Sequence, residues 1–342
     1  MAKIEKMFGA ILKDQEQKSD ELRDKIHAEN KLKKKDEEAM MRKQSLKKAA
    51  ALAISVMCMA GVFTGCGNNK SNNSSGDNAN TDAKLTGSIT AAGSSALKPL
   101  VDDAADLFNE KHPDVNITID AGGSGEGLKQ VAEGTVNIGN SDVEAAEKLD
   151  ASKASQLVDH KVCVVTMAPI VNKDVTAGGV KNLTKQQLTD IFTGKITNWK
   201  EVGGADESIV LITRPESSGT RATFKKYALG GATEASNKSM ETDDSGVLLQ
   251  NVKTTKGAIG YVALSYLTKD AGVDTVSLDG VAPTLENTYS GKYPVWTYEH
   301  MYTKGTPNET TQKFLDYIMS DEYGKKMESL GYGVSSKMQV KE

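Results

Sequence analysis

Apolar residues follow two alternating periods along the chain from Lys84 onward. In residues 94–112 an apolar side chain recurs every three or four positions, which predicts an amphipathic helix. In residues 115–120 apolar and polar side chains alternate, which predicts a strand. A strand pattern followed by a helix pattern recurs at 136–149 and again at 208–229. This alternation predicts an α/β fold with mainly parallel sheets.

Polar clusters stand at four places where a predicted strand ends and a predicted helix begins. They are Ser94-Ser95, Ser124-Gly125, Ser141-Asp142 and the segment 214–220. Open α/β sheets bind ligands at this edge, where helix N-termini offer unpaired N–H groups and a partial positive charge. A single serine before a helix is most often only a cap. Four such junctions together favour a site for a small anion.

The arginines point to one of these junctions. Only Arg214 and Arg221 lie outside residues 1–65, and the short segment between them contains Glu216 and the run Ser-Ser-Gly-Thr. A guanidinium, a carboxylate and a row of hydroxyl groups predict a site for an oxygen-rich anion. We expect Arg221, one turn into the helix, to be a surface charge rather than a direct contact.

The charge balance excludes several classes of partner. The formal net charge is -4, and residues 66–342 carry 28 basic and 36 acidic side chains, so a long-range positive field does not attract the anion. Aromatic residues make up 5% of the chain, which argues against nucleic-acid stacking surfaces. Three scattered cysteines and four scattered histidines form neither a disulfide framework nor a metal-ligand spacing. We therefore expect no nucleic-acid partner, no metal and no cofactor.

The N-terminal region resembles a bacterial lipoprotein signal. Basic residues at 42–48 precede an uncharged apolar run at 49–63, and Thr-Gly-Cys follows at 64–66. The run has the length of a signal-peptide core and is short for a membrane span; a buried helix is the alternative. The resemblance implies a signal peptide at 41–65 and a lipid on Cys66. The polar, Gly/Ser/Asn-rich residues 66–83 then form a flexible tether.

Residues 1–40 fit neither part. They are densely charged and could form a helix, whereas a signal peptide normally begins a chain. Two interpretations are open: a cytoplasmic extension, or translation that begins at Met40 or Met41. We favour the second, in which this charged extension is not translated.

Six segments of the remaining chain resemble one protein family in their sequences and in their order along the chain. They are AAGSSALKPLV, GGSGEGLKQVAEG, VNIGNSDVE, LTKQQLTDIFTGKITNWKEVGG, ITRPESSGTRATF and KGAIGYVALSY. Across nearly all of 84–342 the chain is similar to the phosphate-binding proteins of bacterial phosphate ABC transporters, which have the type II periplasmic-binding-protein fold.

The resemblance implies two α/β lobes joined by two crossing hinge strands. Lobe I would comprise 84–164 and 263–342, and lobe II would comprise 165–262, with the crossings near 161–172 and 257–266. It also implies a non-enzymatic, monomeric protein, lipid-anchored on the extracytoplasmic face of the cell membrane. Such a protein binds inorganic phosphate with high affinity and delivers it to the permease and ATPase subunits of an importer.

The resemblance also assigns the phosphate-binding residues. In lobe I they are Ser95, the N–H of Ala96, Ser124 and Asp142; in lobe II they are Arg214, Ser218, Gly219 and Thr220. Where the family pattern has aspartate and glycine, this chain has Glu216 and Ser217. We expect Glu216 to hold the guanidinium of Arg214.

Asp142 indicates which anion is bound. A carboxylate only accepts hydrogen bonds, so it favours an anion that keeps a proton, as phosphate does near neutral pH and sulfate does not. Such mismatches discriminate by roughly 10⁴–10⁵-fold. A helix-capping aspartate would look the same in sequence. Three rival hypotheses are a binder of another oxyanion, an enzyme on a related two-lobed fold, and a surface adhesin or structural lipoprotein.

Overall fold

The computed structural model describes residues 84–235, 239–267 and 271–341, which belong to one compact unit. The predicted extension at 1–40, the signal peptide at 41–65, the tether at 66–83 and Cys66 lie outside the described residues. No helix among the residues described is long and apolar enough to cross a membrane.

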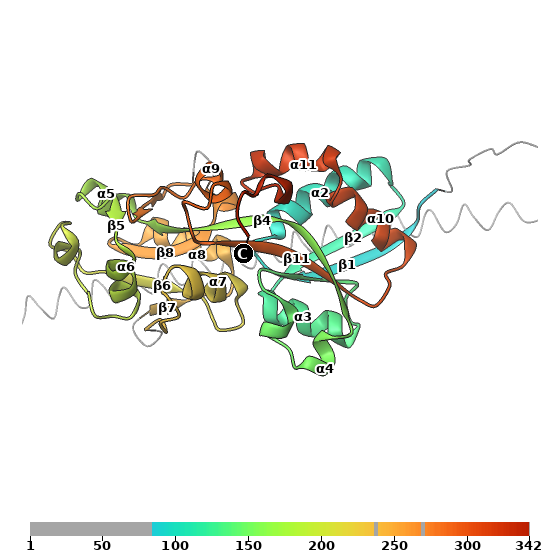
Figure 1. The fold of residues 1–342 in the computed structure, drawn as a ribbon, viewed down its shortest axis with the longest axis horizontal. Helices are drawn as coiled ribbons and strands as arrows, with labels where there is room; N and C mark the ends of the chain where they lie inside the picture. Colours follow the sequence, from blue (N-terminus) through green and yellow to red (C-terminus); the bar gives the residue numbers. More distant parts are fainter. Residues whose placement is uncertain (1–83, 236–238, 268–270, 342) are drawn as a thin grey trace, which may run out of the picture. The chain divides into compact units, whose positions relative to one another are not determined.

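Lobe I is built on three parallel strands, as the alternating pattern predicts. Strand β1 lies between β2 and β3, with Gly87 opposite Val115 and Ala91 opposite Ile138. Figure 1 shows α2 and α10 on one side of these strands and α3 on the other. The lobe I elements are β1 (Gly87–Gly93), α2 (Lys98–Lys111), β2 (Val115–Ala121), α3 (Ser124–Glu133), β3 (Ile138–Ser141), α4 (Ala151–Ala154), α10 (Glu309–Ile318) and α11 (Asp321–Met327).

Lobe II repeats this plan on a second set of parallel strands. Strand β6 lies between β7 and β8, and a separate two-stranded sheet pairs β5 with β10. The elements on this side are α5 (Lys173–Ala177), β5 (Asn182–Leu183), α6 (Lys185–Phe192), β6 (Val210–Thr213), α7 (Gly219–Tyr227), β7 (Ser239–Glu241), α8 (Ser245–Thr254), β8 (Ala258–Ala263), β9 (Asp274–Thr275) and β10 (Ser277–Leu278). Helix α9 (Leu285–Tyr289) follows, and its Tyr289 hydroxyl donates to Glu328 at 2.8 Å.

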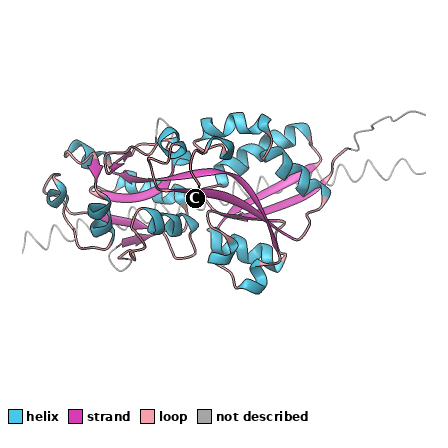
Figure 2. Ribbon diagram, viewed as in Figure 1, coloured by secondary structure: helices cyan, strands magenta, loops and turns pink. Residues whose placement is uncertain are grey.

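Two long antiparallel strands connect the lobes (Figure 2). Strand β4 (Leu157–Val171) pairs with β11 (Trp296–Lys304) over 157–166 and with β8 over 167–171, so it runs through both lobes. The predicted crossing at 161–172 lies on β4. After the second predicted crossing, β9 and β10 still pair with β4 and β5, and the strand that joins lobe I is β11. The boundaries between lobe I and lobe II stay a prediction.

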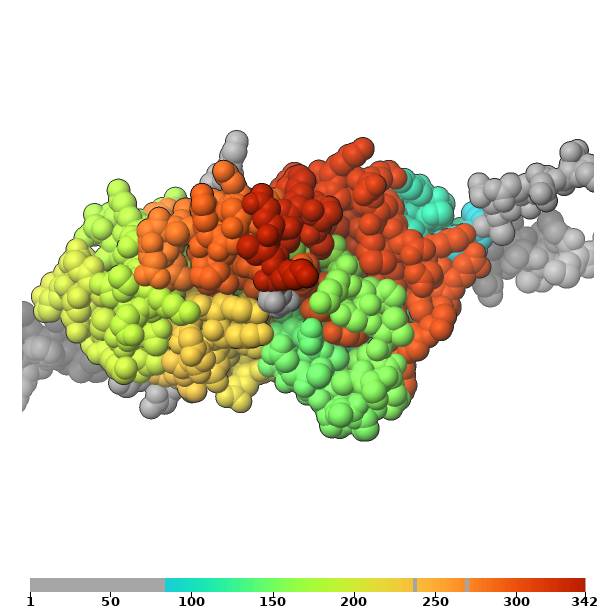
Figure 3. All heavy atoms as spheres, viewed as in Figure 1, coloured from blue at the N-terminus to red at the C-terminus, as the bar shows by residue number. Residues whose placement is uncertain are grey.

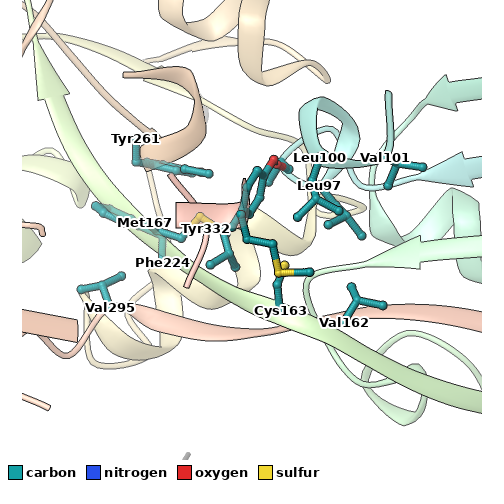
Figure 4. Packing of buried hydrophobic residues seen from close by; sticks show 14 of the residues in the cluster. Leu97, Leu100, Val101, Val162, Cys163, Met167, Phe224, Tyr261, Val295 and Tyr332 are labelled. Atoms are coloured by element: carbon teal, nitrogen blue, oxygen red, sulfur yellow. The ribbon is translucent and has the colours of Figure 1, made fainter. Parts of the chain in front are cut away.

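An apolar core lies along β4 and includes residues of both lobes. Leu97, Leu100 and Val101 from α2 and its preceding turn lie near Cys163 and Tyr332, while Phe224 and Tyr261 stack in lobe II with ring centroids 4.2 Å apart (Figure 4). Cys163 is a free, buried cysteine, as its apolar strand position predicts. Each fully buried side chain of this size contributes roughly 1.5–3 kcal/mol, so the core fixes the strand ends that carry the polar clusters.

Candidate anion site

The turn after β1 brings two serines to the carboxyl edge of the lobe I sheet. The hydroxyl of Ser94 donates to a carboxylate oxygen of Asp142 and accepts the N–H groups of Ala96 and Leu97, each at 3.1 Å. The hydroxyl of Tyr266 donates a hydrogen bond to the carbonyl of Ser95 at 2.6 Å, which helps to fix the turn. Ser95 is therefore held with its hydroxyl facing lobe II.

Ser124 and Asp142 are joined directly. The hydroxyl of Ser124, at the start of α3, accepts the N–H of Asp142 at 3.0 Å. Asp142 follows β3, is only 1% exposed, and also accepts the hydroxyl of Thr220 at 2.8 Å. Its carboxylate thus accepts hydroxyl groups from both lobes, one on each oxygen.

Arg214 directly follows β6 and is 1% exposed. Its two terminal nitrogens donate to the hydroxyls of Ser245 (2.8 Å) and Ser95 (3.2 Å), and one of them also donates to the carbonyl of Asp243. The hydroxyls of Ser95 and Ser245 are 2.9 Å apart. A buried guanidinium and two serine hydroxyls from opposite lobes therefore meet at one point.

The start of α7 lies against lobe I. Ser218 is the N-cap residue, and its hydroxyl accepts the N–H of Arg221 at 3.2 Å. At Gly219 an added Cβ would lie 2.2 Å from the hydroxyl of Ser124 and 2.9 Å from the Cβ of Asp142, so only glycine fits there. The predicted residues Ser95, Ser124, Asp142, Arg214, Gly219 and Thr220 are therefore neighbours across one contact between the lobes.

Two expectations about segment 214–220 and its flank are wrong. Glu216 is exposed, and the groups that bind the Arg214 guanidinium are the serines and carbonyl named above. Pro215 and the tight turn direct the Glu216 side chain outward. The backbone carbonyl of Glu216 accepts a hydrogen bond from the Nζ of Lys148 at 2.6 Å. Arg221 is buried rather than a surface charge, because the carboxylates of Glu234 (3.4 Å) and Glu241 (3.5 Å) attract it inward.

Comparison with known proteins identifies the family. A protein-family model described as "PBP superfamily domain" matches residues 78–322. The phosphate-binding protein PstS of Bacillus subtilis is 50% identical over 265 residues, which cover 77% of this chain and 86% of that protein. The chain belongs to the phosphate-binding proteins of bacterial phosphate ABC transporters.

Solved structures of this family have the same fold. A structure described as a phosphate ABC transporter substrate-binding protein with bound phosphate, from Clostridium perfringens, is 32% identical with a TM-score of 0.66 and covers 75% of this chain and 100% of that one. An ABC-type phosphate transport receptor from Vibrio cholerae is 26% identical with a TM-score of 0.57, covering 72% and 99%. The predicted type II periplasmic-binding-protein fold is confirmed.

Burial shapes the electrostatics around this candidate site. It raises the pKa of Glu234 to about 7 despite the nearby Arg221, and it raises the pKa of the Tyr266 hydroxyl well above its usual value. Burial also lowers the pKa of Lys148. Among the described residues, no cluster of three or more His, Cys, Asp or Glu side chains is placed to hold a metal ion.

Sequence reasoning missed three residues that support the site: Ser245, Tyr266 and Lys148. Ser245 had a signal, because Asp244-Ser245-Gly246 opens α8 directly after β7 and is a further strand-to-helix junction. Tyr266 and Lys148 had no local signal, since their partners are 171 and 68 residues away in the chain.

Proposed function

We propose that this protein binds inorganic phosphate outside the cytoplasm and delivers it to the permease and ATPase subunits of a phosphate ABC importer, acting as a monomer. The observation that carries the proposal is Asp142, a buried acceptor beside the contact where Arg214 meets serine hydroxyls of both lobes. The names of the Bacillus subtilis relative and the Clostridium perfringens structure support phosphate as the ligand.

The residue types match a protonated tetrahedral anion. Arg214 supplies directed, charge-assisted donors, and Ser95, Ser124, Ser218 and Thr220 supply hydroxyls. The N–H groups of Ala96 and Gly219, at the two strand-to-helix junctions, are the proposed backbone donors, and that of Ala96 would exchange the Ser94 hydroxyl for the ligand. Asp142 accepts the proton that phosphate keeps, and a sulfate ion would leave it facing unprotonated oxygen.

Binding between two lobes implies closure around the ligand. Ser95, Ser124 and Asp142 come from lobe I, whereas Arg214 and Thr220 come from lobe II. Figure 3 shows the two lobes in contact. Across this contact the N–H of Gly125 donates to the carbonyl of Ser217 at 3.0 Å. In our proposal β4 and β11 flex when the lobes open and close. The family's role is substrate binding for transport, and we propose binding without turnover.

Calorimetry tests the ligand. The protein is unfolded to remove bound anions, refolded, and titrated with phosphate and with sulfate at the same ionic strength. We expect tight binding of phosphate and little binding of sulfate, and we expect Asp142→Asn to reduce the discrimination by at least tenfold. Equal affinities for both anions in the unmodified protein would contradict the proposal.

Lipid anchoring at Cys66 is the proposed route to the extracytoplasmic face of the cell membrane. Mass spectrometry of the protein purified from cell membranes should show an N-terminal diacylated Cys66, and Cys66→Ser should move the protein from the membrane fraction to the soluble fraction. Recovery of residues 1–40 in the mature protein would contradict processing after residue 65.

A further inference from the structure

A second carboxyl group, that of Glu299, lies behind Asp142. Glu299 is on β11, where the adjacent residue His300 pairs with Ser141 in an antiparallel register, so Glu299 lies beside Asp142, the residue that follows β3. It is completely buried, and its β4 neighbour is Cys163. Figure 4 shows Cys163 within the apolar cluster, so the strand neighbour of Glu299 belongs to that core.

The groups that face Glu299 do not stabilise a negative charge on it. Neither of its oxygens has a hydrogen-bond partner among the described residues. The titratable groups around it are Asp142, Cys163 and the Tyr332 hydroxyl, and the ring of His300 is bound to Asp159 instead. Burial first, and then the charge of Asp142, raise the pKa of Glu299 well above its usual value.

One proton between the two carboxyls removes this conflict. Two ionised carboxylates repel each other, whereas a protonated carboxyl donates a hydrogen bond to an ionised one. The hydroxyls of Ser94 and Thr220 already stabilise charge on Asp142, and no comparable donor faces Glu299 in the described structure. This arrangement favours a protonated Glu299 that donates to Asp142.

We propose that Glu299 is a specificity-determining positioning residue that keeps a proton and donates it to Asp142, so that Asp142 remains a charged acceptor for a protonated anion. This inference rests on the proposed binding of phosphate. Glu299 does not touch the ligand in this proposal. It acts by keeping Asp142 a hydrogen-bond acceptor. A protonated Asp142 could donate a hydrogen bond to sulfate, and the discrimination against sulfate would be lost.

Two substitutions of Glu299 separate hydrogen bonding from packing. Glu299→Gln keeps a neutral donor of the same size, whereas Glu299→Leu keeps the volume and removes the donor. We expect the ratio of phosphate affinity to sulfate affinity to stay within about threefold in Glu299→Gln and to fall roughly 10- to 100-fold in Glu299→Leu, the range that one hydrogen bond to a charged group supports. Glu309→Gln, an exposed glutamate on α10, is the charge control.

The proton itself is measured in the unmodified protein without phosphate. Carboxyl-carbon NMR with assignment from Glu299→Gln should show Glu299 protonated at neutral pH. An ionised Glu299, or an unchanged affinity ratio in a folded Glu299→Leu protein, would overturn the inference. Failure of the unmodified protein to bind phosphate would instead overturn the proposed function, and the NMR result would still decide where the proton lies.

Discussion

At the scale of single residues, the site depends on how closely the two lobes approach. Asp142 bonds to Thr220 at 2.8 Å, and this contact leaves no room for a side chain at position 219. Glycine is required there for space rather than for backbone conformation, since its φ is not in the left-handed region. Ser124 and Asp142 of lobe I therefore limit the size of the residue at position 219 in lobe II.

Gly219→Ala should weaken phosphate binding. The new methyl group would lie 2.2 Å from the Ser124 hydroxyl, and overpacking of this kind costs roughly 1–3 kcal/mol, or about 5- to 150-fold in affinity if it acts on the closed arrangement. Calorimetry with phosphate measures the loss. Gly324→Ala on α11 is the matched control, because a methyl group there meets no atom within 4 Å. An unchanged phosphate affinity in Gly219→Ala would show that the lobes do not approach this closely when phosphate is bound.

Glu234 should make stability depend on pH. Burial raises its pKa from 4.5 to about 7, so between these values the folded protein binds more protons than the unfolded chain does. Its contribution to stability is therefore present below about pH 4.5 and is lost as the pH rises through about 7. We measure the free energy of unfolding in urea at about pH 5 and about pH 8. Between these pH values it should fall less in Glu234→Gln than in the unmodified protein. The same pH dependence in both proteins would contradict this account; Glu309→Gln serves as the control.

At the scale of helices and strands, the sequence predicted those elements and junctions that a local pattern of residues encodes. Periodicity located α2 and β2, and strand-to-helix junctions located Ser95, Ser124, Asp142 and Arg214. It did not place Glu299 beside Asp142, because that contact depends on the antiparallel register of β11 against β3, in which His300 lies opposite Ser141. Contacts between distant strands have no local period, so such partners are found only in the folded structure.

Helix α6 shows a local signal that predicts stability rather than function. Thr184 is its N-cap, its hydroxyl accepts the N–H of Gln187 at 3.1 Å, and the side chain of Gln187 accepts the N–H of Thr184 at 2.9 Å. Thr184→Ala should lower the free energy of unfolding by about 1 kcal/mol and leave phosphate affinity unchanged. Thr184→Ser, which keeps the hydroxyl, should restore most of the loss in urea unfolding. A change in phosphate affinity with Thr184→Ala would mean that α6 is coupled to the site.

At the scale of the whole described unit, hydrogen bonds around the anion site join the lobes that β4 and β11 connect. Lys148 donates to Glu216 at 2.6 Å, Gly125 donates to Ser217 at 3.0 Å, and Ser95 lies 2.9 Å from Ser245. Each contact exists only while the lobes are together. A ligand that binds both lobes is therefore released at a rate that these contacts help to set.

Lys148→Ala should accelerate phosphate release. Lys148 is partly buried at the edge of the site and bonds to a backbone carbonyl of the other lobe, so its removal weakens the closed state without touching Arg214 or Asp142. We expect the dissociation rate to rise roughly three- to tenfold, in keeping with one modest hydrogen bond, and the association rate to change little. Stopped-flow measurements with phosphate separate the two rates, and Lys153→Ala on the exposed face of α4 is the matched control. If the loss appeared in the association rate instead, Lys148 would act by attracting the anion through its charge, and the contact with Glu216 would not hold the lobes closed.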